Sequence, residues 1–147
     1  MTSDTSGADT RVVAPQPDHL DVRYVGGEEY EITVRGHRVR VDQPTEHGGM
    51  DRAPTPTELF VASLAGCVAF YAGRYLSRHG FDREGLTVRT EFLMATNRPA
   101  RVAAIRIFLH PPIGFPAERV AALVAVASGC TVHNTLQHKP QITVAVA

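Results

Sequence analysis

The sequence predicts an α+β fold in which short antiparallel strands surround two central helices. Residues 54–80 and 115–127 carry apolar or small side chains on nearly every side of much of their length, which is typical of buried helices. The segments around them alternate apolar and polar residues, which is typical of strands. Because the predicted order is β-β-β-α-β-β-α-β, the strands are grouped, and this favours α+β over alternating βαβ units.

The chain has 147 residues, enough for one domain with a core of its own. Residues 1–17 are rich in Ser, Thr, Asp, Gly and Pro, and we expect them to form a disordered arm. Residues 18–147 form the folded domain in this interpretation. The predicted elements of its first part are strands at 19–25, 30–35 and 38–41, turns at 26–27 and 36–37, and a polar loop at 42–53.

The predicted helix at 54–80 has a clear start signal. Thr55 or Thr57 can cap it, a proline suits its first turn, and Glu58 suits the positive end of the helix dipole. Its apolar run, 59–72, has 14 residues, whereas about 20 are needed to cross a bilayer. We therefore expect the central helix of a soluble core, with no membrane contact.

After residue 80 the sequence again alternates apolar and polar residues, which is typical of strands. The predicted elements are strands at 86–94 and 101–109, a helix at 115–127, a short helical turn at 131–139 and a closing strand at 141–146. The two strands are expected to pair as a hairpin. Pro116 and Glu118 suit the first turn of the helix that follows them.

The two apolar helices predict self-association. One sheet of six short strands shields one face of each helix, so something else must shield the other face. Symmetric dimers are the commonest oligomers. We therefore predict a homodimer in which the helices lie buried between two sheets.

The composition excludes several classes of partner. Lys plus Arg and Asp plus Glu number 15 each, so no net field favours nucleic acid or an anionic membrane surface. The N-terminus has no basic segment followed by an apolar one, which predicts no signal peptide and a cytoplasmic protein. In that compartment, two cysteines are more often free thiols or a catalytic pair than a structural disulfide.

Two segments carry the two cysteines. PTELFVASLAGC covers 56–67 and ends at Cys67, and CTVHNTL covers 130–136 and begins at Cys130. A P-x-E-L-x-x-A-x-x-A-G-C helix with a C-[TP]-V-x-x-x-L turn later in the chain resembles the OsmC/Ohr superfamily. The resemblance extends from about Asp21 to the C-terminus, and it is greatest to the broad OsmC-like branch.

The resemblance implies an OsmC-like fold, an intertwined α+β homodimer with two active sites at its interface. It also implies that Cys67 is the peroxidatic cysteine, which attacks a hydroperoxide, and that Cys130 is the resolving cysteine, which closes a disulfide. The chemistry is consistent with the residues, because a thiolate attacks the peroxide and a second thiol consumes the sulfenic acid. Such a pair needs Cα atoms within about 7 Å, so the two segments must pack together.

The family's peroxidases lower the pKa of the first cysteine with an Arg and a Glu. The family Glu directly follows the helix proline, where this chain has Thr57, with Glu58 one residue later. On a straight helix Glu58 and Cys67 are about half a turn out of phase, so Glu58 faces its own Cys67 only if the first turn is distorted. The residue nearest the place of the family Arg is Glu28, and Arg52 is the expected substitute.

Other interpretations of these residues stay open. Cys67 could be an inert small hydrophobe, Glu58 could serve only the helix start, and Arg52 could be a solvated loop residue. Cys67, Cys130 and His133 could be metal ligands, although zinc normally takes four ligands or three with water. A Cys–His pair for acyl transfer is chemically possible, but the sequence has no oxyanion motif. His133 is otherwise expected to be a turn residue that hydrogen-bonds the chain end.

The predicted function is therefore a thiol-dependent peroxidase that acts in an oxidative stress response. Organic hydroperoxides are the expected substrates, and hydrogen peroxide a poorer one, because Phe60, Leu64, Phe70 and Tyr71, or their neighbours in the dimer, are expected to line the site. No metal or cofactor is expected, and the reductant is an external dithiol, either a protein or a small molecule. The alternative is a weakly reactive or non-catalytic OsmC-like dimer that binds a small lipophilic molecule at its interface.

Overall fold

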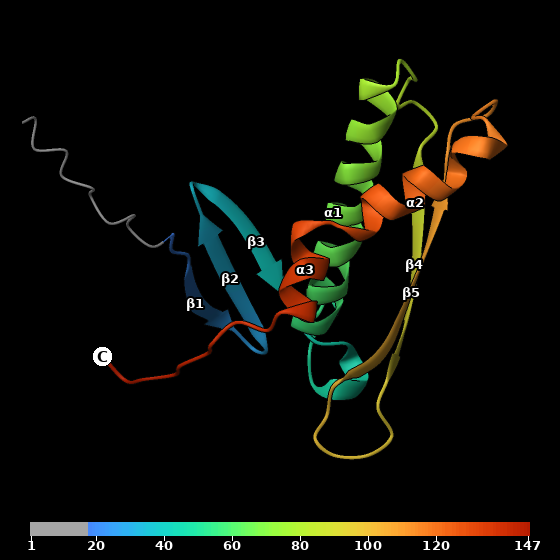
Figure 1. Ribbon diagram of the computed structural model, residues 1–147. Coiled ribbons are helices and arrows are strands. Elements are labelled where there is room, and N and C mark those ends of the chain that lie inside the picture. Colours follow the sequence, from blue (N-terminus) through green and yellow to red (C-terminus); the bar gives the residue numbers. More distant parts are fainter. Residues whose placement is uncertain (1–17) are drawn as a thin grey trace, which may run out of the picture.

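A computed structural model describes residues 18–147, so the predicted arm at 1–17 lies outside the described residues. The strands are β1 (Asp21–Gly26), β2 (Glu29–Val34), β3 (His37–Val41), β4 (Thr87–Met94) and β5 (Val102–His110). The helices are α1 (Pro56–Arg78), α2 (Val120–Ser128) and α3 (Thr131–Gln137), and short 3-10 turns lie at Thr45–His47 and Ala117–Arg119. This mixed architecture of antiparallel sheets and helices confirms the predicted α+β class (Figure 1).

The first sheet has the order β1-β2-β3, and all of its pairings are antiparallel. The turn between β2 and β3 consists of Arg35 and Gly36, both in the left-handed region with φ values of 47° and 80°. Two successive positive φ values match the twist of the flanking strands, which is why this turn favours a tight hairpin. The predicted hairpin is therefore present, displaced by one residue toward the N-terminus.

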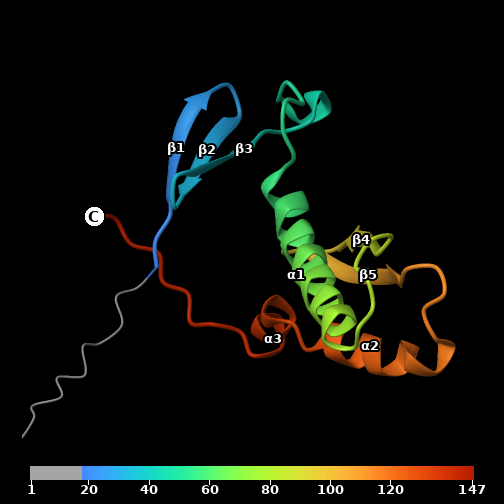
Figure 2. The ribbon, with the colours of Figure 1, turned by 90° about the horizontal axis from the view of Figure 1, so that it is seen from above.

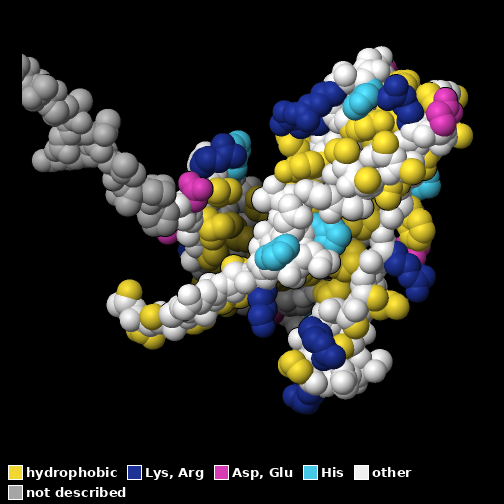
Figure 3. All heavy atoms as spheres, viewed as in Figure 1, with side chains coloured by type: hydrophobic (Ala, Val, Ile, Leu, Met, Phe, Trp, Pro, Cys, Tyr) yellow, Lys and Arg dark blue, Asp and Glu magenta, His cyan; other side chains and the backbone are white. Residues whose placement is uncertain are grey.

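The two faces of this sheet differ sharply in chemistry. On one face Arg23, Glu31 and Arg40 lie directly opposite one another, and Arg23 Nη2 is 2.9 Å from Glu31 Oε1. The rows on the other face are Val22–Ile32–Val39 and Tyr24–Tyr30–Val41. This apolar face is largely open to solvent, and Tyr24 is 61% exposed. Hydrophobic side chains are visible over this part of the molecule as well as over the helices (Figure 3).

Helix α1 begins at a capping box. Thr55 Oγ1 accepts a hydrogen bond from Glu58 N at 3.1 Å, and Glu58 Oε1 accepts one from Thr55 N at 3.0 Å. Pro56 follows the cap at the first helical position, where its missing N–H costs nothing. Gly80, with φ of 78°, lies just beyond the helix end. By length and composition alone α1 could cross a membrane, but here it packs as a core helix against α2, α3, β4 and β5.

The core lies where α1 meets α2 and the β4–β5 hairpin (Figures 1 and 2). Its buried members are Leu64, Val68, Ala72, Tyr75, Leu123, Ala127 and Cys130. The side chains from α1 recur every three or four residues, so they form one stripe along the helix. The three-stranded sheet stands apart from this core, on the far side of the loop that leads into α1 (Figure 2).

One expectation about the layers needs correction. The strands form two separate sheets, one of three strands and one of two, and not a single sheet of six. Each helix nevertheless keeps an uncovered face in the single chain, as expected, since Phe70 on α1 and Val124 on α2 are 53% and 46% exposed. The covered stripe of α1 is the one that faces α2 and the β4–β5 hairpin.

The predicted closing strand at 141–146 is absent from the structure of the single chain, where these residues are extended without strand pairing. The three apolar side chains of the segment are exposed, Ile142 by 81%, Val144 by 93% and Val146 by 102%. The sequence has the strand period, but a strand also needs a neighbouring strand to accept and donate its hydrogen bonds. Within the described part of this chain the segment has no such neighbour.

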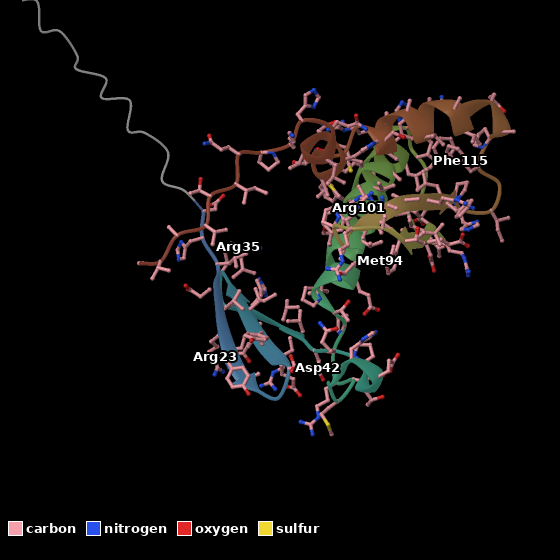
Figure 4. All side chains as sticks on the ribbon, turned by 90° about the horizontal axis from the view of Figure 1, so that it is seen from below. Arg23, Arg35, Asp42, Met94, Arg101 and Phe115 are labelled. Atoms are coloured by element: carbon pink, nitrogen blue, oxygen red, sulfur yellow. The ribbon has the colours of Figure 1, made fainter. Side chains whose placement is uncertain are left out.

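Asp42 organises the loop between the first sheet and α1. Its side chain is buried, and its carboxylate accepts hydrogen bonds from Gln43 N at 2.8 Å, Met50 N at 3.2 Å and Arg52 N at 3.0 Å. Gly49 is packed so closely on the Gln43 carbonyl that a Cβ there would clash. Figure 4 shows Asp42 at the join between the sheet and the loop. These contacts fix the direction in which the chain enters α1.

We expect Asp42→Asn to destabilise the fold, with the largest loss near neutral pH. The amide group presents N–H donors where the carboxylate accepts three backbone N–H groups, mainly that of Arg52, and these bonds lower the pKa of Asp42. A carboxyl with a lowered pKa stabilises the folded state above its unfolded pKa of about 3.9, and this contribution is lost as the pH falls through the folded value. Thermal unfolding measured from neutral pH down into the acid range follows the difference.

The matched control is Asp51→Asn in the same loop, because Asp51 is exposed and asparagine tolerates its positive φ of 52°. The melting temperature of Asp42→Asn should lie clearly below that of Asp51→Asn at neutral pH, and the two should converge in acid. Equal melting temperatures at neutral pH would contradict the role assigned to Asp42.

Candidate functional site

The two cysteines lie together at the junction of α1, α2 and α3. Cys67 is half-buried in the middle of α1, and Cys130 is fully buried between α2 and α3. Both are free thiols, and both pack in the same hydrophobic cluster. The residues are 63 positions apart in sequence, so helix packing alone brings them together. The fold therefore joins the two cysteine motifs that stand apart in the sequence.

The break between α2 and α3 sets the position of Cys130. Helix α2 ends at Ser128, and Cys130 has extended backbone angles and acts as the N-cap of α3. Its Sγ accepts a hydrogen bond from His133 N at 3.4 Å, and Asn134 Nδ2 donates to Gly129 O at 3.1 Å. These local contacts hold the thiol against α1.

The environment keeps Cys130 protonated at neutral pH. Burial raises the pKa of the Cys130 thiol above its ordinary value, and the neighbouring Cys67 thiol raises it further. The backbone N–H groups of His133 and Val132 act in the opposite direction. Because two adjacent thiols cannot both ionise easily, a charge on the half-buried Cys67 disfavours one on Cys130. The Cys130 sulfur is therefore suited to act as a thiol rather than as a thiolate.

A second contact between α1 and α3 lies beside the cysteine pair. The Tyr71 hydroxyl and Thr131 Oγ1 are 2.9 Å apart. Tyr71 is four residues after Cys67, so the two lie on the same side of α1, and Thr131 directly follows Cys130. Tyr71 was expected only as an apolar lining residue, and Thr131 was not among the expected site residues. The spacing of four residues between Cys67 and Tyr71 was the sequence signal that could have placed Tyr71 beside the cysteine pair.

A cavity of about 510 Å³ lies between α1, α2, α3 and β5. It is lined by sequence neighbours of both cysteines and not by Cys67 or Cys130 themselves. Its apolar walls include Phe60, Leu64, Val68, Ile105, Val124 and Leu136, and its polar members are Ser128, His133 and Gln137. Leu64 and Val68 flank Cys67 on α1, at three residues before it and one after it. Of the four residues expected to line the site, Phe60 and Leu64 line this cavity, whereas Phe70 and Tyr71 do not.

Glu58 and Arg52 make their contacts away from the cysteine pair of this chain. Glu58 is held in the capping box with Thr55, mainly by the backbone hydrogen bond that lowers the pKa of its carboxyl. Arg52 Nη1 is 3.4 Å from Oε1 of Glu29, the first residue of the central strand β2, and the Arg52 side chain is largely exposed. Neither residue contacts Cys67 in the described part of the chain. A role in catalysis would require either residue to reach a site on another chain.

Other features bear on the alternatives. No group of three His, Cys, Asp or Glu side chains in residues 18–147 is arranged to hold a metal ion. His133 Nδ1 is 2.6 Å from Ser128 O and its Nε2 is 3.2 Å from Gln137 Nε2. The imidazole therefore bonds to the end of α2 and to its own helix, and not to the end of the chain.

Comparison with known proteins agrees with this fold. The family model for OsmC-like proteins matches residues 47–145. A candidate osmotic stress induced and detoxification response protein from Psychrobacter arcticus is similar in structure, with a TM-score of 0.76 and 21% identity over 84% of this chain and 91% of that one. An organic hydroperoxide resistance protein OsmC from Legionella pneumophila is similar with a TM-score of 0.63 and 19% identity, over 84% of this chain and 92% of that one.

A third solved structure, an OsmC-like protein of unknown function from Vibrio cholerae, gives a TM-score of 0.62 and 11% identity over 82% of this chain and 94% of that one. None of the curated proteins matches the sequence.

The fold and the paired cysteines define an OsmC-like protein. The family match covers most of the chain, and the protein therefore belongs to the OsmC family, as the two motifs predicted.

Proposed function

We propose that the protein is a thiol-dependent peroxidase that reduces organic hydroperoxides, and hydrogen peroxide less well. The observation that carries this proposal is the pairing of the half-buried Cys67 with the fully buried Cys130 beside an apolar cavity. Two thiols in contact are what a peroxidatic and resolving pair requires. The apolar cavity favours an organic group over hydrogen peroxide, because burial of that group contributes binding energy.

The reaction has three steps, which are oxidation of Cys67, formation of the disulfide and its reduction. The Cys67 thiolate attacks the terminal oxygen of the hydroperoxide, the O–O bond breaks, and Cys67 becomes a sulfenic acid as the alkoxide leaves and takes a proton. The Cys130 thiol then attacks the sulfenic sulfur, which forms a disulfide and releases water. An external dithiol, protein or small molecule, reduces the disulfide by thiol exchange.

The test is rapid mixing of the reduced protein with cumene hydroperoxide and, separately, with hydrogen peroxide. Because the chain has no Trp, loss of free thiol and residual peroxide are measured after quenching. We expect loss of both thiols for each peroxide consumed, and a faster reaction with cumene hydroperoxide. Consumption no faster than by a free thiol in solution would contradict the peroxidase function.

A second candidate function rests on a separate observation. Glu58 and Arg52, the expected activators of Cys67, are engaged with Thr55 and Glu29 in the single chain. An apolar cavity of about 510 Å³ is within the usual size range of small-molecule sites. A slow or unreactive Cys67 in the mixing experiment, together with saturable binding of a lipophilic fluorescent probe, would favour an OsmC-like binding module.

A further inference from the structure

His133 is the only side chain with an imidazole, carboxyl, thiol or amine group among the described residues that line the apolar cavity. The other polar lining residues are Ser128 and Gln137, whose hydroxyl and amide groups are neutral. His133 lies on α3, three residues after Cys130, and its backbone N–H donates to Cys130 Sγ. The imidazole is therefore tied to the cysteine pair through the same turn.

The hydrogen bonds of His133 determine which ring nitrogen faces a ligand. Nδ1 is 2.6 Å from the Ser128 carbonyl oxygen, which can only accept, so Nδ1 carries a proton. The other ring nitrogen, Nε2, lies 3.2 Å from Nε2 of Gln137. The Gln137 amide donates to a neutral Nε2, and after a rotation its oxygen accepts from a protonated one. The pair can therefore hold either state of the ring.

The proposed reaction needs an acid on the cavity side of Cys67. The terminal oxygen of the hydroperoxide is transferred to sulfur, whereas the other oxygen stays with the organic group. If the apolar cavity holds that group, the alkoxide forms next to the cavity. An alkoxide is a strongly basic leaving group, so a positioned acid accelerates its departure.

The other groups that can lose a proton near the site are less suited to this role. The Cys130 thiol is fully buried beneath Cys67, and its proton is needed for the resolving step. The Tyr71 hydroxyl is bonded to Thr131 and does not line the cavity. No Lys, Arg, Asp or Glu from α1, α2, α3 or β5 lines the cavity in the described chain.

We propose that His133 is the proton donor to the leaving alkoxide, an inference that rests on the proposed peroxidase function. As the S–O bond forms at Cys67 and the O–O bond breaks, the Nε2 proton of the imidazolium passes to the alkoxide. The products are the Cys67 sulfenic acid, an alcohol and a neutral His133. Water returns the proton to Nε2 before the next turnover, while Nδ1 keeps its bond to Ser128.

The test compares two oxidants in His133→Asn. The Nδ2 of asparagine is placed like the Nδ1 of histidine, so this variant can keep the bond to Ser128 O while it loses Nε2. tert-Butyl hydroperoxide releases an alkoxide, whereas peracetic acid releases a carboxylate, which leaves without a proton. We expect the rate of thiol loss to fall on the order of 10²-fold with the hydroperoxide and to stay close to wild type with the peracid.

His133→Gln, which reaches the cavity but does not titrate, should show the same selective loss. His138→Asn is the control, since His138 is exposed on the end of α3 and its Nδ1 bonds to Asn134 O at 3.2 Å. If the His133 variants lost thiols equally more slowly than wild type with both oxidants, or as fast as wild type with both, the assignment of His133 would be overturned. If wild type and Cys67→Ser consume both oxidants equally slowly, the peroxidase function itself fails and this inference with it.

Discussion

Cys67→Ser is expected to abolish peroxide consumption altogether. The hydroxyl of serine does not ionise near neutral pH and is a poor nucleophile toward the O–O bond, so the first step has no substitute in the chain. The buried Cys130 cannot replace it, because burial and its neighbour raise the pKa of its thiol. Quenched assays of residual cumene hydroperoxide measure this effect. A variant that consumed peroxide as fast as wild type would exclude Cys67 as the nucleophile.

Cys130→Ser provides the matched comparison, because it makes the same sulfur-to-oxygen replacement at the other cysteine of the pair. Without an added dithiol this variant should consume one equivalent of peroxide and keep Cys67 as the sulfenic acid, since no other thiol of the chain remains to attack it. Dimedone should label Cys67 in this variant, and mass spectrometry would locate the adduct. Continued turnover with a dithiol at the wild-type rate would show that Cys130 is not needed for resolution.

The protein is expected to sediment as a homodimer of about twice 16.0 kDa at micromolar concentration. The single chain leaves an apolar sheet face, much of α2 and the C-terminal segment uncovered, and exposed apolar patches are typical of protein–protein interfaces. A second chain would cover these surfaces and could pair with residues 141–146. We therefore propose an obligate dimer of the intertwined kind. A stable, folded monomer under these conditions would contradict this proposal.

Substitutions on the two faces of the first sheet locate the interface. Val39→Lys places a charge on the apolar face, whereas Thr33→Lys places the same charge on the face that carries Arg23 and Glu31. We expect the first variant to weaken the dimer by orders of magnitude in dissociation constant, because the lysine must be desolvated without a partner. The second should remain dimeric. Analytical ultracentrifugation over a dilution series measures both.

Local signals in the sequence were sufficient for most of the secondary structure. The capping box at Thr55 and Glu58 starts α1 through hydrogen bonds between residues three apart. The positive φ of Gly36 in the turn between β2 and β3 follows from the conformational freedom of glycine, although the sequence predicted this turn one residue later, at 36–37. Such interactions depend on a few neighbouring residues, so the sequence contains all the information that they require.

The motifs around Cys67 and Cys130 also predicted which two thiols would meet. Their amino-acid pattern resembles the OsmC family closely enough to imply the α+β fold. The sequence by itself therefore determined the class of protein and the two sulfur atoms on which its proposed chemistry depends.

Only the tertiary structure decided what surrounds these sulfur atoms. It placed Thr131 against Tyr71, put the His133 ring in the cavity wall, and bound Arg52 to Glu29 away from Cys67. It also left residues 141–146 without a strand partner in the described chain, although their sequence has the strand period. Such contacts join segments far apart in the chain or on different chains, and their geometry depends on how the helices and sheets pack. No local pattern of residues specifies that packing.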